Sequence, residues 1–402
     1  MKIAGIVAEY NPFHTGHAYQ IAQTRVQLGE DAGIVAVMSG NWVQQASCAV
    51  ADKWTRAHLA LMGGADLVLE LPTVWATASA EGFARGAVTL LHSTGMVDHL
   101  CFGSEGGNVT ALKQVADCLD TPDYREQLAL YLDRGLSFPA ARQQAVEVLL
   151  GPAAGLLSTP NNNLGIEYLR SLNALDRSIT PLTVLRQGAA HNTISSDAPT
   201  FVSATHIRHN LAQGQWEPIV PYLIPGGREV LEGSSLGFAR LERVERAMLA
   251  RVRTMSVEDW AALPDSGQAE GLPRRLEKAG QQCTSMDEFY DLVKTKRYTH
   301  ARLRRLALWA YLGLTAGQIP NTPPYLRVLG FNRRGQAILK EMKQTASLPL
   351  ITKPAHARDL DERGRTLFEL EARFTDLYDL CLEQIPAPGR EWRQNPAIST
   401  SL

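Results

Sequence analysis

The chain has 402 residues, of which 45% are hydrophobic and 20% are charged, and its formal net charge is -1. These values are typical of a globular protein with two domains and exclude a uniformly basic protein. The five cysteines are scattered without CxxC spacing, which argues against a disulfide framework or a zinc site. Because the sequence contains neither 18 consecutive apolar residues nor a signal-peptide core, we expect a cytoplasmic protein without a membrane anchor.

Short apolar runs alternate with segments of helical spacing in the first part of the chain. Strands are predicted over residues 3–8, 33–38, 66–71 and about 99–102, and helices over residues 51–62, about 78–91 and a segment ending at residue 29. Such alternation predicts an α/β fold with a Rossmann-like parallel sheet covered on both faces. Ligands bind at the carboxyl ends of the strands in sheets of this kind.

Helical spacing dominates the rest of the chain. A helical section is predicted over residues 109–149, helices over residues 166–175, 207–211, 236–251, 286–294 and 301–314, and one short strand over residues 183–186. We therefore predict an α/β domain over residues 1–205 and a mainly α-helical domain over residues 206–402. The Pro-rich segment 319–325 is predicted to be a linker or rigid turn, and the residues from Pro386 onward a loosely held tail.

The motif His14-Thr15-Gly16-His17 directly follows the first predicted strand and opens a helix. Its spacing places both imidazoles on one face of the first turn, beside backbone N–H groups that lack intrahelical partners. The helix dipole adds positive potential there, and Gly16 leaves room for a nucleotide. Two histidines at a helix start could also be a polar surface or capping pair. The position after the first strand favours adenylate transfer, with His14 and His17 donating to the phosphates of ATP.

The motif belongs to a longer segment, Ala8-Glu9-Tyr10-Asn11-Pro12-Phe13-His14-Thr15-Gly16-His17. With this segment the chain closely resembles the bacterial tRNA(Met) cytidine acetate ligase family, relatives of the HxGH nucleotidyltransferases. Further segments match that family's pattern in the same order: residues 38–40, 53–54, 66–72, 83–86, 102–105, 160–162, 203–208, 296–299 and 327–332. So long an ordered set is far more specific than a single motif.

The resemblance implies an ATP-dependent ligase that forms a carbon–nitrogen bond. Acetate would attack ATP to give acetyl-adenylate and pyrophosphate, and the acetyl group would pass to N4 of the wobble cytidine of elongator tRNA(Met). By the same resemblance, residues 1–205 form the nucleotidyltransferase-like catalytic domain and residues 206–402 the tRNA-binding domain. Mg²⁺ is expected to accompany ATP, with the triphosphate supplying most of its ligands, because no carboxylate cluster marks a protein-held metal site. Glu9 or Glu105 could participate through water.

The resemblance also implies which residues contact ATP. These are Val7, Ala8, Glu9, Tyr10, Asn11, Pro12, Phe13, His14, Thr15, Gly16, His17, Ala18, Tyr19 and Gln20, then Gly103, Asn161 or Asn162, and Arg186. Ser203, Thr205 and Arg208 would lie where related nucleotidyltransferases hold the β- and γ-phosphates. The expected catalytic residues are His14, His17 and Arg208.

The physical chemistry of these later residues allows other interpretations. A guanidinium such as that of Arg186 binds phosphate oxygens bidentately, but it could equally form a surface ion pair. Ser203 and Thr205 could cap the helix at residue 207 instead of donating to pyrophosphate, and the asparagines could cap the helix that follows them. From the sequence, both kinds of interpretation stay open.

The loop after the second strand departs from the family pattern. Members usually carry a cationic Arg-Gly-Glu-Pro-like stretch there, whereas this chain has Gln45-Ala46-Ser47-Cys48. Lys53 could supply positive charge nearby or could be a solvated helix lysine. Because of this departure, a tRNA-binding protein without catalysis stays an alternative, as does a small-molecule adenylyltransferase.

The best basic run for an RNA partner lies over residues 294–305. It contains Lys294, Lys296, Arg297, Arg302, Arg304 and Arg305 and no acidic residue. Tyr298 and His300 interleave with these charges, and Arg333-Arg334 could extend the surface. The alternative is a solvated basic helix face, but the resemblance favours contact with the tRNA backbone.

Overall fold

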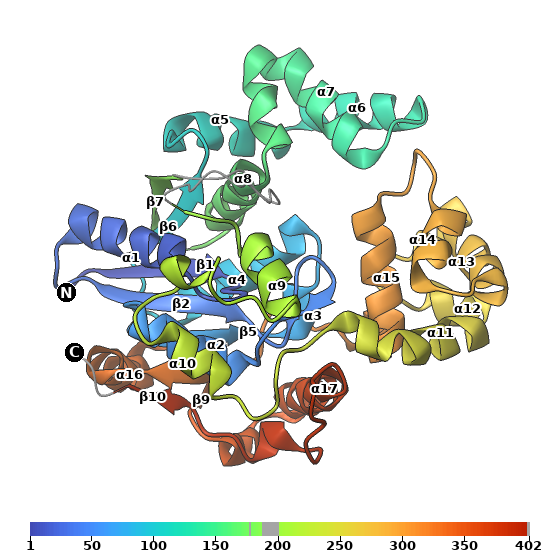
Figure 1. Cartoon of the computed structure of the whole chain (residues 1–402). Helices are drawn as coiled ribbons and strands as arrows, with labels where there is room; N and C mark the ends of the chain where they lie inside the picture. The colour runs from blue at the N-terminus through green and yellow to red at the C-terminus, as the bar shows by residue number, and fades with distance from the viewer. Residues whose placement is uncertain (177, 187–200, 400–402) are drawn as a thin grey trace.

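A mixed sheet of eight strands forms the centre of the computed structural model, which describes residues 1–176, 178–186 and 201–399 (Figure 1). The strands are β1 (Ile3–Ala8), β2 (Gly33–Ser39), β5 (Leu67–Leu71), β6 (His99–Ser104), β7 (Thr180–Leu185), β8 (Leu326–Phe331), β9 (Leu350–Ile351) and β10 (Ala397–Ile398). Their order is β10-β8-β5-β2-β1-β6-β7, with β9 also paired to β8, and β5 and β8 are the antiparallel neighbours. The predicted parallel sheet is therefore confirmed from β5 to β7.

Helices cover both faces of the sheet because its central strands are apolar on both sides. In β2, Val35 and Val37 join one core cluster, whereas Ile34 and Ala36 join the other. The first cluster includes residues of α4 (Ala80–Ser93), α8 (Pro160–Asn173) and α16 (Arg333–Thr345). The second includes residues of α1 (Thr15–Leu28), α2 (Lys53–Met62), α9 (Ala204–Ala212) and α10 (Gly227–Glu232).

Two groups of helices extend from this sheet layer (Figure 1). The predicted helical section between β6 and α8 is confirmed as α5 (Val109–Leu119), α6 (Pro122–Asp133), α7 (Phe138–Leu150) and the 3-10 helix η1 (Gly151–Ser158). The second group, called the helical lobe below, consists of α11 (Glu245–Thr254), α12 (Val257–Ala261), α13 (Leu272–Gln282), α14 (Met286–Val293) and α15 (His300–Leu312). The helix predicted over residues 236–251 starts later than expected, since α11 begins at residue 245.

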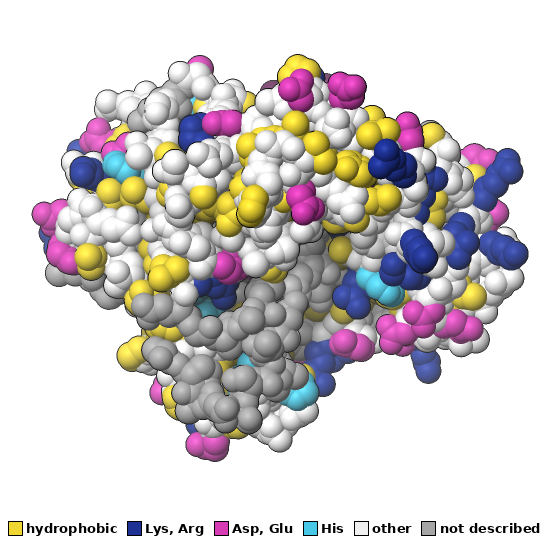
Figure 2. Space-filling model, turned by 90° about the horizontal axis from the view of Figure 1, so that it is seen from above, with side chains coloured by type: hydrophobic (Ala, Val, Ile, Leu, Met, Phe, Trp, Pro, Cys, Tyr) yellow, Lys and Arg dark blue, Asp and Glu magenta, His cyan; other side chains and the backbone are white. Residues whose placement is uncertain are grey.

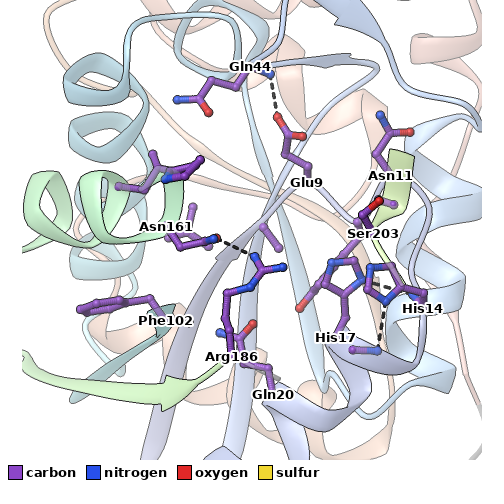
Figure 3. A pocket seen from close by; sticks show the side chains of 18 of the residues that line it. Glu9, Asn11, His14, His17, Gln20, Gln44, Phe102, Asn161, Arg186 and Ser203 are labelled. Carbon is purple, nitrogen blue, oxygen red and sulfur yellow. Dashed lines mark hydrogen bonds between the residues drawn. The ribbon is translucent and has the colours of Figure 1, made fainter. Parts of the chain in front are cut away.

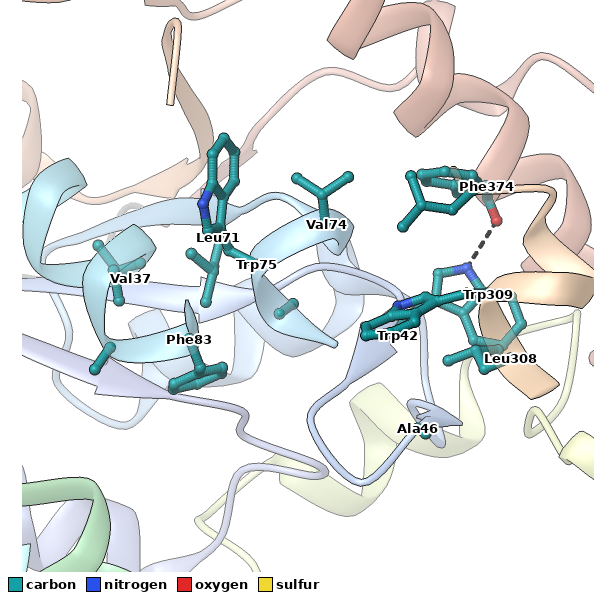
Figure 4. Packing of buried hydrophobic residues seen from close by; sticks show 14 of the residues in the cluster. Val37, Trp42, Ala46, Leu71, Val74, Trp75, Phe83, Leu308, Trp309 and Phe374 are labelled. Carbon is teal, nitrogen blue, oxygen red and sulfur yellow. Dashed lines mark hydrogen bonds between the residues drawn. The ribbon is translucent and has the colours of Figure 1, made fainter. Parts of the chain in front are cut away.

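The helical lobe packs against the sheet layer through buried tryptophans. Trp42, in the short hairpin of β3 (Trp42–Val43) and β4 (Ser47–Cys48), and Trp309 of α15 belong to the same buried cluster (Figure 4). The indole Nε1 of Trp42 donates to the carbonyl oxygen of Phe374 at 3.0 Å, and that of Trp309 donates to Thr77 Oγ1 at 2.9 Å. Phe374 belongs to α17 (Glu362–Asp379), so three distant parts of the chain share this core.

The last part of the chain returns to the sheet, although the sequence there shows mainly helical spacing. The run Leu326–Phe331 is apolar enough to be buried as β8, and β10 pairs with it. The prediction of a loosely held tail from Pro386 onward was wrong. Glu391 is only 1% exposed and forms an ion pair with Lys53. The functional division at residues 205 and 206 stays a prediction. Among the helices described, none has both the length and the apolar character needed to cross a membrane.

Candidate active site

A cavity of about 360 Å³ opens at the carboxyl ends of β1, β6 and β7, between the starts of α1, α8 and α9. Most of the residues predicted to contact ATP line it. These are Val7, Ala8, Glu9, Tyr10, Asn11, His14, Gly16, His17, Tyr19, Gln20, Gly103, Asn161, Arg186, Ser203, Thr205 and Arg208. Pro12, Phe13, Thr15, Ala18 and Asn162 were also predicted but do not line the cavity.

His14 and His17 form a reciprocal cap at the start of α1. His14 Nδ1 accepts a hydrogen bond from the backbone N–H of Gly16 at 3.0 Å, and His17 Nδ1 accepts from the backbone N–H of His14 at 3.2 Å. The ring centroids lie 3.9 Å apart, side by side at the cavity wall (Figure 3). The capping interpretation and the catalytic one are therefore compatible, because capping uses only one nitrogen of each ring.

The cap determines the protonation state of both rings. An Nδ1 that accepts a backbone N–H carries no proton, so a neutral ring carries its proton on Nε2 and can donate from there. Burial, followed by the charges of Arg186 and Arg208, lowers the pKa of His14 to about 3. Burial and neighbouring His14 lower the pKa of His17 well below its usual value. The two imidazoles are thus neutral hydrogen-bond donors at the start of a helix, where an anion is also stabilised by the dipole.

Arg186 reaches the cavity from the end of β7 and contacts the start of α8. Its Nη1 donates to Asn161 Oδ1 at 2.8 Å (Figure 3), and Asn161 Nδ2 donates to Glu105 Oε1 at 2.6 Å. Asn162 lies 3% exposed behind this wall, where its Oδ1 accepts from the backbone N–H of Glu105 at 3.1 Å. Asn161 is therefore the asparagine of this pair that lines the cavity, and Asn162 holds the loop after β6.

Gly103 of β6 allows Arg186 to lie against the strand end. A Cβ at residue 103 would come within 3.3 Å of Arg186 Cγ, which is closer than ordinary side-chain contacts. The missing side chain of Gly103 thus leaves room for a cavity-lining arginine.

Three predicted phosphate contacts come together at the start of α9. Ser203 Oγ accepts from the backbone N–H of His206 at 3.2 Å, which confirms the helix cap. Arg208 Nη2 donates to Thr205 Oγ1 at 3.1 Å, and its Nη1 donates to the carbonyl oxygen of Asn11 at 2.7 Å. These bonds hold the guanidinium at the cavity wall.

Glu9 projects from the end of β1 into the same cavity (Figure 3). Its Oε1 accepts from the backbone N–H of Gln44 at 2.7 Å, and its carbonyl oxygen accepts from Arg56 Nη1 at 2.6 Å. Burial raises the pKa of the Glu9 carboxyl, although the Gln44 bond and the charges of Arg208 and Arg56 oppose this shift.

Part of the cavity wall was missed by the sequence analysis. The missed residues come from the β3–β4 hairpin, α4, α8, the strand ends and the start of α9: Gln44, Gln45, Ala80, Phe83, Phe102, Pro160, Asn163, Leu164, Tyr168, Val184, Leu185, Phe201, Val202 and Ala204. Most are apolar and resemble ordinary core positions in the sequence, so no motif marks them. This hairpin was named in the sequence analysis only because it lacks a cationic residue. In the structure, Gln44 and Gln45 of the hairpin line the cavity.

Lys53 contradicts both interpretations given to it. It is fully buried, with Nζ 2.6 Å from Glu70 Oε1 and 2.6 Å from Glu391 Oε2. It is therefore neither a solvated lysine nor a residue of the cavity wall, because α2 turns it toward the C-terminal segment.

The basic run over residues 294–305 is only partly free in the structure. Arg302 forms ion pairs with Asp265 at 3.1 Å and Glu270 at 3.0 Å, and Arg305 forms one with Asp265 at 3.3 Å. Lys294 Nζ donates to the carbonyl oxygen of Thr295 at 2.8 Å. The exposed cations of the run are Lys296, Arg297 and Arg304.

Lysine and arginine side chains gather on the surface over the helical lobe, at the right of Figure 2. Arg333-Arg334 does not extend this surface, because α16 and α15 lie on opposite sides of the molecule (Figure 1). Throughout the described part of the chain, no three histidine, cysteine, aspartate or glutamate side chains gather as a metal site would require.

The site agrees with a family model that covers nearly the whole chain. Residues 1–391 match the model of the HIGH Nucleotidyl Transferase family. The chain belongs to the HIGH nucleotidyl transferase family.

Curated and solved HIGH nucleotidyl transferase relatives match the chain over its full length. The tRNA(Met) cytidine acetate ligase of Syntrophomonas wolfei is 36% identical over 100% of both chains, and that of Caldanaerobacter subterraneus is 38% identical over 95% of this chain and 96% of its own. The crystal structure of Thermotoga maritima TmcAL in its apo form is 32% identical and superposes with a TM-score of 0.93 over 100% of both chains. A second structure of that protein, bound with alpha-thio ATP, has a TM-score of 0.90.

Proposed function

We propose that the chain is a tRNA(Met) cytidine acetate ligase, which activates acetate with ATP and transfers the acetyl group to N4 of the wobble cytidine of elongator tRNA(Met). The observation that carries the proposal is the capped pair of His14 and His17 in a chain similar over its full length to ligases of that name. The ATP analogue bound to the similar Thermotoga maritima protein supports ATP as the activating substrate. The product and the localisation in the cytoplasm follow from the same likeness.

In the first step, an acetate oxygen attacks the α-phosphorus of ATP and the bond to pyrophosphate breaks. Negative charge grows on the departing pyrophosphate, and the Nε2–H groups of His14 and His17 donate to the phosphates without a change in their own charge. Arg208, fixed by Asn11 and Thr205, supplies positive charge beside the β- and γ-phosphates. Because these groups are held before ATP binds, they stabilise the transition state without reorganisation.

Arg186, at the end of β7, and Asn161, at the start of α8, also hold the nucleotide. The guanidinium is placed by its bond to Asn161, and its remaining N–H groups can donate to ATP. Mg²⁺ would arrive with ATP and neutralise part of the triphosphate charge, since Glu9 is the sole carboxylate among the described lining residues.

In the second step, the acetyl group passes from acetyl-adenylate to the cytidine amine, and AMP leaves. The exposed cations Lys296, Arg297 and Arg304 are proposed to contact the tRNA backbone. The ion pairs of Arg302 and Arg305 with acidic neighbours favour a structural role for those two residues.

Two measurements on the full chain test the proposal. ATP–pyrophosphate exchange should depend on acetate, and transcribed elongator tRNA(Met) should gain the mass of one acetyl group on the wobble cytidine. ATP–pyrophosphate exchange that does not depend on acetate would indicate a small-molecule adenylyltransferase. If neither exchange nor the mass gain occurred while the chain still bound tRNA, the catalytic proposal would fail in favour of a non-catalytic binding protein.

A further inference from the structure

Transfer of the acetyl group to a cytidine amine requires a proton acceptor, a role that rests on the proposed function. The amine nitrogen attacks the carbonyl carbon of acetyl-adenylate, a C–N bond forms, and the C–O bond to the phosphate breaks as AMP leaves. The nitrogen then carries one proton too many. A side chain that accepts this proton must face the cavity and have an unused lone pair.

The polar residues at the phosphate end of the cavity cannot fill this role. His14 and His17 have no free lone pair, because each Nδ1 already accepts a backbone N–H and each Nε2 carries the ring proton. Arg186 and Arg208 are donors only. Tyr10, Tyr19 and Tyr168 line the cavity too, but a phenol carries its own proton at neutral pH, and burial raises the pKa of Tyr10 and Tyr168 further.

Glu9 has the geometry that these residues lack. Its carboxyl is anchored through Oε1 by the backbone N–H of Gln44 at 2.7 Å, and its backbone is fixed by Arg56 at 2.6 Å. Within the described residues, Oε2 makes no hydrogen bond, so one oxygen is held rigidly while the other can accept a proton. Glu9 is also the only carboxylate among the described residues that line the cavity.

We propose that Glu9 is the general base of the second step and takes the proton from the cytidine N4 amine as the acetyl group is transferred. The groups that face Glu9 are Arg208 from α9, Arg56 from α2 and Tyr168 from α8. Burial raises the pKa of the Glu9 carboxyl, and the charges of Arg208 and Arg56 oppose this shift. A base with a pKa raised in this way removes a proton better than an exposed carboxylate does.

The substitution Glu9→Gln separates the two steps. The amide keeps the size and can still accept from Gln44, but it cannot take a proton. Single-turnover transfer to tRNA should fall by about 10²-fold or more, and acetate-dependent ATP–pyrophosphate exchange should fall by much less. The matched control is Glu147→Gln on the exposed face of α7, which should leave both rates unchanged.

A second readout separates proton transfer from positioning. The wild-type transfer rate should decrease as pH falls through the Glu9 pKa, and this acidic limb should be absent in Glu9→Gln, while Glu9→Asp should recover part of the transfer. Equal loss of exchange and transfer in Glu9→Gln would overturn the inference and place Glu9 at ATP or its Mg²⁺. Transfer at the wild-type rate, or an unchanged acidic limb, would overturn it as well. The wild-type exchange and product mass, measured beside the variants, report on the proposed function itself.

Discussion

Lys53 Nζ lies 2.6 Å from Glu391 Oε2, so a lysine of the first α/β units is paired with a glutamate near the end of the chain. The same Nζ lies 2.6 Å from Glu70 Oε1, and Arg327 Nη2 lies 3.5 Å from Glu391 Oε1. None of these four side chains is more than 3% exposed. The cluster therefore connects α2, β5 and β8 to the C-terminal segment in an environment where an unpaired charge is costly.

Glu391→Gln should destabilise the protein strongly. The substitution removes one partner of Lys53 and the carboxylate beside Arg327, and breaking a buried pair in this way typically costs about 3–5 kcal/mol. Denaturant unfolding followed by tryptophan fluorescence would measure the change. Glu383→Gln, which removes a half-exposed partner of Arg243, is the control and should cost about 1 kcal/mol or less. Equal stability of the two variants would contradict this account.

The sequence was sufficient for those parts of the molecule that depend on local patterns. The strand, loop and helix around His14 were predicted in order, because apolar runs and N-terminal helix signals are local. The pairing of Glu391 with Lys53 and of Asp265 with Arg302 was not predictable, since it depends on how distant segments pack. For the same reason β8 was overlooked: a single short apolar run does not show that it will join the first sheet.

Two substitutions of His14 should separate its capping role from its role toward ATP. Asn is a good N-cap residue and can accept from the Gly16 N–H, but His14→Asn lacks the Nε2 donor. Both His14→Asn and His14→Ala should lower the acetate-dependent exchange rate by about 10²–10³-fold. Only His14→Ala should also lose the helix cap, which should lower the free energy of unfolding by about 1 kcal/mol. Near wild-type exchange in His14→Asn would show that the donor is not used.

The histidine pair should stay neutral far below the usual histidine pKa. Burial, with Arg186 and Arg208 nearby, lowers the pKa of His14 to about 3, whereas a histidine in an unfolded chain titrates near 6.5. Below about pH 6.5 the unfolded state therefore binds protons that the folded state does not, so stability decreases as pH falls toward 3. Nitrogen-15 NMR at pH 5 should show an unprotonated Nδ1 and a protonated Nε2 in His14 and His17. A titration midpoint near 6.5 for either ring would refute this.

Gly16→Ala should disrupt the same pair by steric contact. An added Cβ would come within 2.8 Å of His14 Cε1, and the ring cannot turn away without losing its bond to the Gly16 N–H. Misplacing a catalytic group by about 1 Å can cost about 10²-fold in rate, so exchange at limiting ATP should fall to that extent. Gly317→Ala is the matched control, because a Cβ there meets open space. If both variants exchanged equally well, the tight packing of Gly16 would be irrelevant to activity.

The arginines of the basic run should differ in their effect on tRNA binding. Arg304 is exposed, whereas Arg302 is paired with Asp265 and Glu270 at about the distance of a strong ion pair. Arg304→Gln should weaken tRNA binding and reduce the slope of log K against log salt by about 1, as expected when one phosphate contact is lost. Arg302→Gln should leave that slope unchanged and act on the stability of the helical lobe instead. Fluorescence anisotropy with labelled tRNA at several salt concentrations measures both variants. Only a residue that neutralises a phosphate, and so releases its counterions, can change the salt dependence of binding. If Arg302→Gln reduced the slope and Arg304→Gln did not, the tRNA would contact the face of α15 that carries Arg302.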